Sequence, residues 1–251
     1  MKISKLFTSF GIALTLILFT VQLCEAANTL TCWHAYEDDG TTQSTIGHYM
    51  SSPFVGKVRT YEHNGQVSNN AKAAEALVNG VALWNADSKA SRNLGFALRY
   101  LPYASTSTYN VEFIAGNRTL VRNAVGGICD AAIAKTLIGN LDNGQIISYN
   151  SRNRTIYEYT ANNSNGQQMM RVGLIFGEIE AEAEDGPEPL AERQAAALAR
   201  VSAHEIGHVL GWRGHSNRSD MLMHPSGNNW TIDEVMAKDI AHIKQFYELG
   251  N

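Results

Sequence analysis

Residues 204–215 read His-Glu-Ile-Gly-His-Val-Leu-Gly-Trp-Arg-Gly-His and place three imidazoles and one carboxylate within a short stretch. His204 and His208 are separated by one helical turn, so on a helix they lie on the same face. Two imidazoles in this arrangement can reach one zinc ion, and the glutamate between them projects toward a water molecule. Gly211 can adopt a backbone conformation that ends a helix and turns the chain, which would bring His215 back as a third ligand. Three protein ligands leave a fourth position open, which is typical of a catalytic rather than a structural zinc site.

The residues before this stretch favour a helix. The segment Leu190 to Ala203 is rich in strong helix formers, and Pro189 suits a helix start. We expect the helix to have an open front that carries the histidines and a buried back. That back is predicted to consist of Ala195, Ala199, Ala203, Ile206 and Leu210.

A bare His-Glu-x-x-His can occur by chance on a solvated helix, but here Met223 follows within Met-Leu-Met-His-Pro. The whole run 204–225 resembles the active site of the metzincin clan of zinc metallopeptidases, whose pattern is His-Glu-x-x-His-x-x-Gly-x-x-His followed by a methionine turn. The part after the third histidine is closest to the matrixin form. The resemblance implies a zinc endopeptidase with Glu205 as general base and Met223 beneath the zinc, where the alternative for Met223 is an ordinary core methionine. It also implies that the wall of the substrate pocket begins with His224, Pro225, Ser226 and Gly227.

The chain departs from the metzincin pattern at the third ligand. Gly214 stands where the pattern has histidine, and His215 comes one residue later, a spacing similar to that of the archaemetzincins. Because glycine tolerates unusual backbone angles, a one-residue bulge at Gly214 is physically accessible. We therefore expect His215 to be the third ligand, with His224 as the alternative.

The resemblance extends, more weakly, to the fold. Residues 72–86 resemble the first long helix of the clan, with Leu77, Val81 and Trp84 buried, and residues 233–247 resemble its C-terminal helix. In that last helix Asp239 occupies the place of an aspartate that braces the methionine turn in matrixins. Its expected core contacts are Ile240, Ile243, Phe246 and Tyr247. The predicted fold class is α+β with an α/β-like N-terminal half. We expect a single metzincin-like domain whose twisted mixed sheet is backed by two long helices, with an active-site cleft, a methionine turn and a C-terminal helix.

Strands are predicted from alternating and continuous apolar runs. We expect them over Val55–Tyr61, Leu94–Leu101, Asn110–Ile114, Gln145–Tyr149 paired as a hairpin with Arg154–Tyr159, and Met169–Ile179. Residues 123–133 are expected to be a loop leading into short structure. The acidic run Glu178–Glu188 is expected to be a solvated loop that favours the following helix start, and a Ca²⁺ site or a rim for basic substrates is the alternative.

The N-terminus is predicted to direct export. Residues 1–26 combine Lys2 and Lys5 with an apolar run and small residues before a cleavage point after Ala26, which is typical of a signal peptide. Residues 27–52 are then an N-terminal extension or a short pro-segment, and residues 53–251 the catalytic domain. We expect a secreted or periplasmic protein.

The two cysteines that remain after signal removal are Cys32 and Cys129. A disulfide between them is the favoured interpretation for an exported chain. The alternative is a Cys32 thiolate that blocks the zinc in a latent form, although the sequence around it does not match the matrixin switch.

The net charge of −4 and the absence of a basic block argue against nucleic acid as a partner. We expect a monomer with no membrane span after signal removal and with a protein or peptide substrate. The alternative function is an exported binding or toxin-like module that uses the same fold without proteolysis or acts on a single target. The displaced third histidine supports this alternative, and Glu205 opposes it, because a purely structural zinc needs no base beside it.

Overall fold

The fold is described from a computed structural model. The described residues are 46–50, 54–62, 71–85, 97–102, 105, 109–128, 130, 132–137, 145–149, 154–159, 170–212, 215, 216, 220–224, 235, 239, 240 and 243. Of these, residues 46–50, 59–61, 145–149 and 154–159 are described by their backbone alone.

A mixed five-stranded sheet forms the centre of the molecule, in the strand order β3-β2-β4-β8-β5. The first four strands in that order are parallel, and the edge strand β5 runs antiparallel to β8. In β4 and β8 nearly every residue is buried, as expected for strands covered on both faces. The bounds are β2 Val55–Tyr61, β3 Arg99–Leu101, β4 Val111–Gly116, β5 Ala134–Leu137 and β8 Met170–Ile175.

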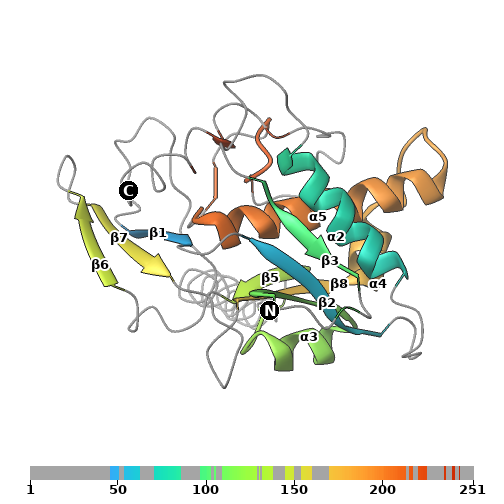
Figure 1. Ribbon diagram of the computed structural model, residues 1–251. Helices are drawn as coiled ribbons and strands as arrows, with labels where there is room; N and C mark the ends of the chain where they lie inside the picture. Colours follow the sequence, from blue (N-terminus) through green and yellow to red (C-terminus); the bar gives the residue numbers. More distant parts are fainter. Residues whose placement is uncertain are drawn as a thin grey trace, which may run out of the picture.

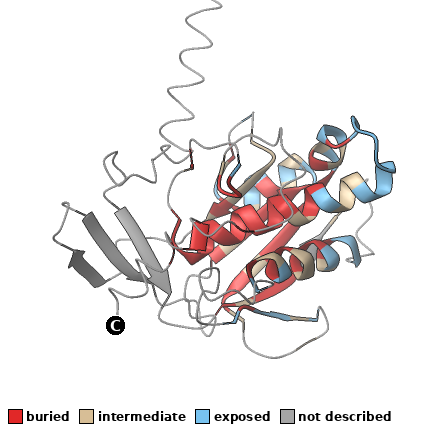
Figure 2. Cartoon of the chain, turned by 90° about the horizontal axis from the view of Figure 1, so that it is seen from above, coloured by how far each residue is buried: buried red, intermediate tan, exposed pale blue. Residues whose placement is uncertain are grey.

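Two long helices, α2 (Ala71–Asn85) and α5 (Leu190–Leu210), cover one face of this sheet (Figure 1). The buried residues of α2 recur every three or four positions and include Leu77, Val81 and Trp84, as predicted. The indole Nε1 of Trp84 donates a hydrogen bond of 2.8 Å to the carbonyl oxygen of Ala203 in α5. The largest part of the core therefore lies between this helical layer and the sheet (Figure 2).

A shorter helix, α3 (Arg118–Ala124), covers the opposite face. Its N-cap is Asn117, whose side-chain oxygen accepts from the amide of Leu120 at 2.9 Å. Val121 and Val125 fill the space above Gly173, where a side chain on β8 would collide with them. The second, smaller apolar cluster of the molecule lies here.

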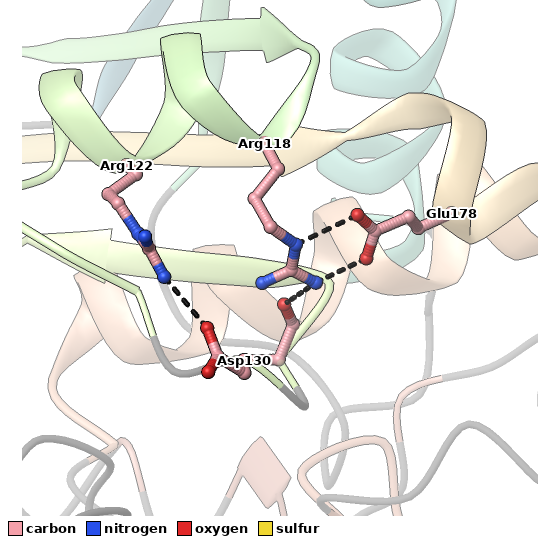
Figure 3. A network of polar contacts seen from close by, with 5 residues as sticks. Arg118, Arg122, Asp130 and Glu178 are labelled. Carbon is pink, nitrogen blue, oxygen red and sulfur yellow. Dashed lines mark hydrogen bonds and ion pairs between the residues drawn. The ribbon is translucent and has the colours of Figure 1, made fainter.

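Ion pairs connect α3 to its surroundings (Figure 3). The guanidinium of Arg118 donates to both carboxylate oxygens of Glu178 in α4 (Phe176–Glu182) and, at 3.0 Å, to the carbonyl oxygen of Ala132. Arg122 pairs with Asp130 at 2.7 Å. These contacts hold α3, α4 and the segment leading into β5 together.

A second, three-stranded sheet has the order β1-β7-β6. The strands β6 (Gln145–Tyr149) and β7 (Arg154–Tyr159) form the antiparallel hairpin that the sequence predicts. The strand β1 (Ile46–Met50) pairs parallel with β7 and contacts α5. Because β1 belongs to residues 27–52, part of the expected extension or pro-segment is a strand of this sheet. The proteolytic removal of residues 27–52 as a pro-segment stays a prediction.

The mixed sheet and the two backing helices confirm the predicted architecture, but two local predictions were wrong and two others had inexact bounds. The strand predicted over Met169–Ile179 ends at Ile175, and the acidic run begins within α4 rather than in a loop. Phe176, Ile179 and Ala183 are buried at helical spacing, which explains why the chain turns helical there. Within the strand predicted over residues 94–101, the structure has a strand at Arg99–Leu101. The loop predicted over residues 123–133 begins too early, because residues 123 and 124 still belong to α3.

The C-terminal helix is described only in part. Residues 239, 240 and 243 are helical, and Ile240 and Ile243 are buried as predicted, whereas Phe246 and Tyr247 lie outside the described residues. The expected signal peptide, residues 1–26, also lies outside them. Within the described part of the chain, no helix has the length and apolarity needed to cross a membrane.

Candidate metal centre

Three imidazoles converge at the C-terminal end of α5. One nitrogen each from His204, His208 and His215 forms a group whose atoms all lie within 4.8 Å of one another. The rings of His204 and His215 stack with centroids 5.1 Å apart, and the ring of His208 stands nearly perpendicular to both. Three imidazoles are a donor set that zinc takes, and a tetrahedral ion at about 2.1 Å from each nitrogen would draw the nitrogens to about 3.4 Å from one another.

The end of α5 brings the third histidine to the other two. Gly211 has a φ of 127°, which side-chain-bearing residues rarely adopt, and it ends the helix. The amide of Trp212 donates to the carbonyl oxygen of Gly207 at 3.0 Å, and the amide of Gly211 to that of His208 at 3.2 Å. This pair of bonds is a Schellman motif and reverses the chain. His215 thereby joins the group despite its displaced position, whereas the expected bulge at Gly214 lies outside the described residues.

Two backbone carbonyls fix the orientation of the helical histidines. The Nδ1 atom of His204 lies 2.9 Å from the carbonyl oxygen of Leu222, and the Nδ1 atom of His208 lies 2.7 Å from that of Trp212. Because a carbonyl only accepts, each Nδ1 carries the hydrogen, and each Nε2 presents its lone pair to an ion. Burial, followed by the neighbouring charges of His208 and His215, holds the pKa of His204 well below its usual value, so this ring is neutral, as a ligand must be.

Glu205 is buried beside these ligands. Thr136 of β5 donates its hydroxyl to Oε2 of Glu205 at 2.6 Å. Burial raises the pKa of Glu205 to about 7, opposed by the bond from Thr136 and by the positive charge of Lys135.

The helix face that carries the site was expected to be open, and this was wrong. His204, Glu205 and His208 are only 8%, 5% and 3% exposed, because β5 and the segment around Leu222 pack against this face. The predicted buried back was wrong in part as well. Ala203, Ile206 and Leu210 are buried, whereas Ala195 and Ala199 are only partly so.

Met223 lies behind the histidines. It is fully buried, and a side chain added at Gly207 would meet its sulfur at 2.3 Å. Since Gly207 lies between His204 and His208 on α5, the methionine packs against the helix at the level of both imidazoles. Its place beneath a zinc ion stays a prediction, because an ordinary core methionine would be buried in the same way.

Asp239 braces the turn that contains Met223. Its Oδ2 accepts a hydrogen bond of 3.3 Å from the amide of Leu222, the residue whose carbonyl holds His204. Asp239 is fully buried, and its negative charge acts on the buried guanidinium of Arg200 in α5. The expected bracing contact is therefore present.

The remaining predicted site residues fall into two groups. His224 is half-buried, donates its amide to the carbonyl oxygen of Met221 at 3.2 Å, and is not a member of the three-histidine group. Five others lie outside the described residues, namely Cys32, Cys129, Pro225, Ser226 and Gly227. Thr136 and the carbonyl of Leu222 were not found from the sequence, because no local pattern indicates a contact between distant segments. The carbonyl of Trp212 lies only four residues after His208, and its contact depends on how the chain turns at Gly211.

The family model for peptidase M10, matrixin, matches residues 45–248. The chain belongs to the matrixin family. A comparison with curated proteins found no match. Membership of the matrixin family confirms the metzincin resemblance, accounts for the single-domain fold, and makes the chain a zinc metallopeptidase in general terms. The matched region of this matrixin begins just before β1 and so takes in the three-stranded sheet as well.

Proposed function

We propose that this chain is an exported zinc endopeptidase that hydrolyses peptide bonds within proteins or peptides. The observation that carries the proposal is a buried carboxylate, Glu205, next to three convergent imidazoles, each of which offers one nitrogen as a ligand for a shared ion. Zinc bound there would polarise the scissile carbonyl and make a water molecule more acidic.

Glu205 acts as the general base that takes a proton from the attacking water and passes it to the leaving amine. The pKa of about 7 belongs to the chain without an ion. A nearby divalent cation favours the carboxylate and lowers this pKa, so Glu205 enters the reaction ionised.

The substrate binds as an extended strand along β5. This strand is the last in its sheet and pairs only with β8 among the described strands. Backbone pairing with such an edge holds a peptide without regard to its side chains. Because Thr136 of β5 touches Glu205, the same edge lies next to the proposed base.

The alternative of a non-proteolytic binding module has lost its main support. That support was the displaced third histidine, yet His215 lies with His204 and His208 in one group. A binding module also gives no reason for the burial of Glu205 beside them.

The deciding experiment replaces the proposed base by its neutral isostere. Glu205→Gln should keep about one zinc per chain and lose at least about a hundredfold in kcat on a fluorogenic peptide, because general-base catalysis contributes on that order. Glu192→Gln, at an exposed position in the first turn of the same helix, is the matched control and should keep full activity. Full turnover by Glu205→Gln would refute the proposal.

Export rests on residues 1–26 and is tested separately. The full chain, produced in cells with a secretory pathway, should leave the cytoplasm and begin at residue 27 when its N-terminus is sequenced. Retention of the chain inside the cell with residues 1–26 attached would contradict this part of the proposal.

A further inference from the structure

We propose that Thr136 is a positioning residue that fixes the carboxylate of Glu205 in its working orientation. The inference rests on the peptidase function proposed above and adds to it a residue that lies far from the zinc-binding motif in the sequence. The hydroxyl of Thr136 lies 2.6 Å from Oε2 of Glu205 and 3.0 Å from the backbone oxygen of the same residue. Because Oε2 is held in this way, the reacting proton passes to Oε1.

The register of β5 sets the position of Thr136, and contacts on both faces of the sheet fix that register. Thr136 pairs with Val172 of β8, and both side chains are buried on the side of α5. The preceding residue, Lys135, donates its ammonium to the carbonyl oxygen of Gly127 at 2.7 Å. Since a shift by one residue would exchange the two faces, Lys135 and Thr136 together fix the hydroxyl toward Glu205.

The hydroxyl can serve Glu205 before and after proton transfer. A threonine hydroxyl has a single hydrogen to donate, and here it has two acceptors on one residue. When Glu205 is ionised, the carboxylate is the stronger acceptor and takes the bond. When Glu205 is protonated, the hydroxyl can turn to the backbone oxygen, so the hydroxyl hydrogen of Thr136 has an acceptor in either state.

A fixed carboxylate matters because a base must meet its water in a narrow range of geometry. The glutamate side chain rotates about several bonds, so it needs a partner that holds it. The positive charge of Lys135 also acts on Glu205, but the ammonium of Lys135 is hydrogen-bonded to the carbonyl oxygen of Gly127. Loss of the Thr136 hydroxyl should therefore slow the chemical step and leave substrate binding unchanged.

The test compares Thr136→Val, which keeps the shape and removes the hydroxyl, with Thr136→Ser, which keeps the hydroxyl. We expect Thr136→Val to lower kcat about tenfold to a hundredfold, the range of one hydrogen bond to a charged group, with KM and zinc content unchanged. Thr136→Ser should restore kcat to within about threefold of the parent. Thr119→Val, at an exposed position on α3, is the matched control and should retain the parent kcat. Unchanged kcat in Thr136→Val, or equal losses in the valine and serine variants, would overturn the proposal.

A second readout needs no catalysis. In the zinc-free protein at pH 8, the unfolding equilibrium constants of Thr136→Val, Glu205→Leu and the double variant form a double-mutant cycle. We expect the two residues to be coupled by about tenfold. If the free-energy changes of the two single variants simply add in the double variant, and the parent cleaves peptides, the positioning role of Thr136 would be overturned and the proposed function would stand. A parent that shows the coupling but cleaves no peptide would overturn the proposed function, and with it the role of Thr136 in the reaction, while the contact itself would stand.

Discussion

The three histidines of the site are positioned in two different ways. His204 and His208 owe their position to α5 and to two carbonyl acceptors, whereas His215 is brought in by the turn at Gly211. The sequence predicted the three histidines and the glutamate, since these lie in one short motif. It did not predict Thr136 or the carbonyl of Leu222, because hydrogen bonds between distant segments leave no periodic signal, and it did not predict the carbonyl of Trp212, because that contact depends on the turn at Gly211.

The displaced third histidine leads to a prediction about zinc content. His215→Ala should lose zinc during dialysis, because two imidazoles alone leave the ion without its third protein ligand. His224→Ala, a change in a histidine outside the group, should keep about one zinc per chain. Elemental analysis of both purified variants decides the matter. Full zinc in His215→Ala together with loss in His224→Ala would show that the ligand is His224.

The burial of Glu205 predicts how stability depends on pH in the zinc-free protein. Folding raises the pKa of this carboxyl from 4.5 to about 7, so the folded state binds the proton more tightly than the unfolded state. The resulting stabilisation is fully present below about pH 4.5 and is lost as the pH rises to about 7. The loss amounts to roughly 3 kcal/mol.

Glu205→Gln removes this loss because glutamine does not ionise. At pH 8 the zinc-free variant should be more stable than the parent by about 2–3 kcal/mol, and the difference should vanish near pH 4.5. Urea unfolding at four or five pH values measures the difference directly. A gap between parent and variant that is the same at every pH would contradict the assigned pKa.

At the scale of elements, the crossing of α2 and α5 supports the metal centre from behind. A side chain at Gly80 of α2 would meet the Oγ and Cβ of Ser202 at 2.7 and 2.9 Å and the amide nitrogen of Ala203 at 3.0 Å. Trp84 of the same helix donates a hydrogen bond to the carbonyl oxygen of Ala203, and its ring packs against Gly207. The two helices therefore touch most closely just before and within the segment that bears His204 and His208.

Gly80→Ala should destabilise the protein by about 1–3 kcal/mol, because overpacking at this contact outweighs the higher helix propensity of alanine. Gly177→Ala is the matched control. Nothing lies within 4 Å of a side chain there, so the change should stabilise the protein by about 0.5–1 kcal/mol. Thermal unfolding of the two variants gives opposite signs if the close approach is real, and equal shifts would contradict it.

Elements with many apolar residues were predicted well, and short ones were not. α2 was recognised by its resemblance to the first long helix of the clan, α5 by its run of strong helix formers, and the β6–β7 hairpin by its apolar strand patterns. α3 was not predicted, because it has only seven residues, of which Val121 alone is buried. The best signal for this helix in the sequence was its N-cap, Asn117. β5 escaped because Ala-Lys-Thr-Leu combines residues that neither alternate nor form an apolar run, and its strand form depends on pairing with β8.

At the scale of the whole molecule, zinc should contribute to stability because only the folded chain brings the three histidines together. A ligand present at a hundred times its dissociation constant adds about 2.7 kcal/mol. For a domain of this size we therefore expect a chelator to lower Tm by about 5–10 °C. The measurement is thermal unfolding with zinc and with a chelator. His215→Ala should show little difference between the two conditions, and a parent with the same Tm in both would contradict a three-histidine zinc site.

The class of the fold was predictable, and so was the β6–β7 hairpin of the second sheet, but the third strand of that sheet was not. A mixed sheet with two backing helices follows from the pattern of apolar segments and from the metzincin resemblance. The pairing of β1 with β7 joins segments more than a hundred residues apart, and such pairing depends on the folded core that brings them together.

The bond between Leu222 and Asp239 gives this molecule an order of completion during synthesis. A chain that has been translated only as far as residue 225 already contains all three histidines, the glutamate and the methionine. It still lacks Asp239, whose carboxylate accepts from the amide of Leu222, the residue whose carbonyl oxygen orients His204. A fully braced zinc site therefore requires a chain that extends past Asp239, and a chain that stops before this residue has the motif without the support that orients it.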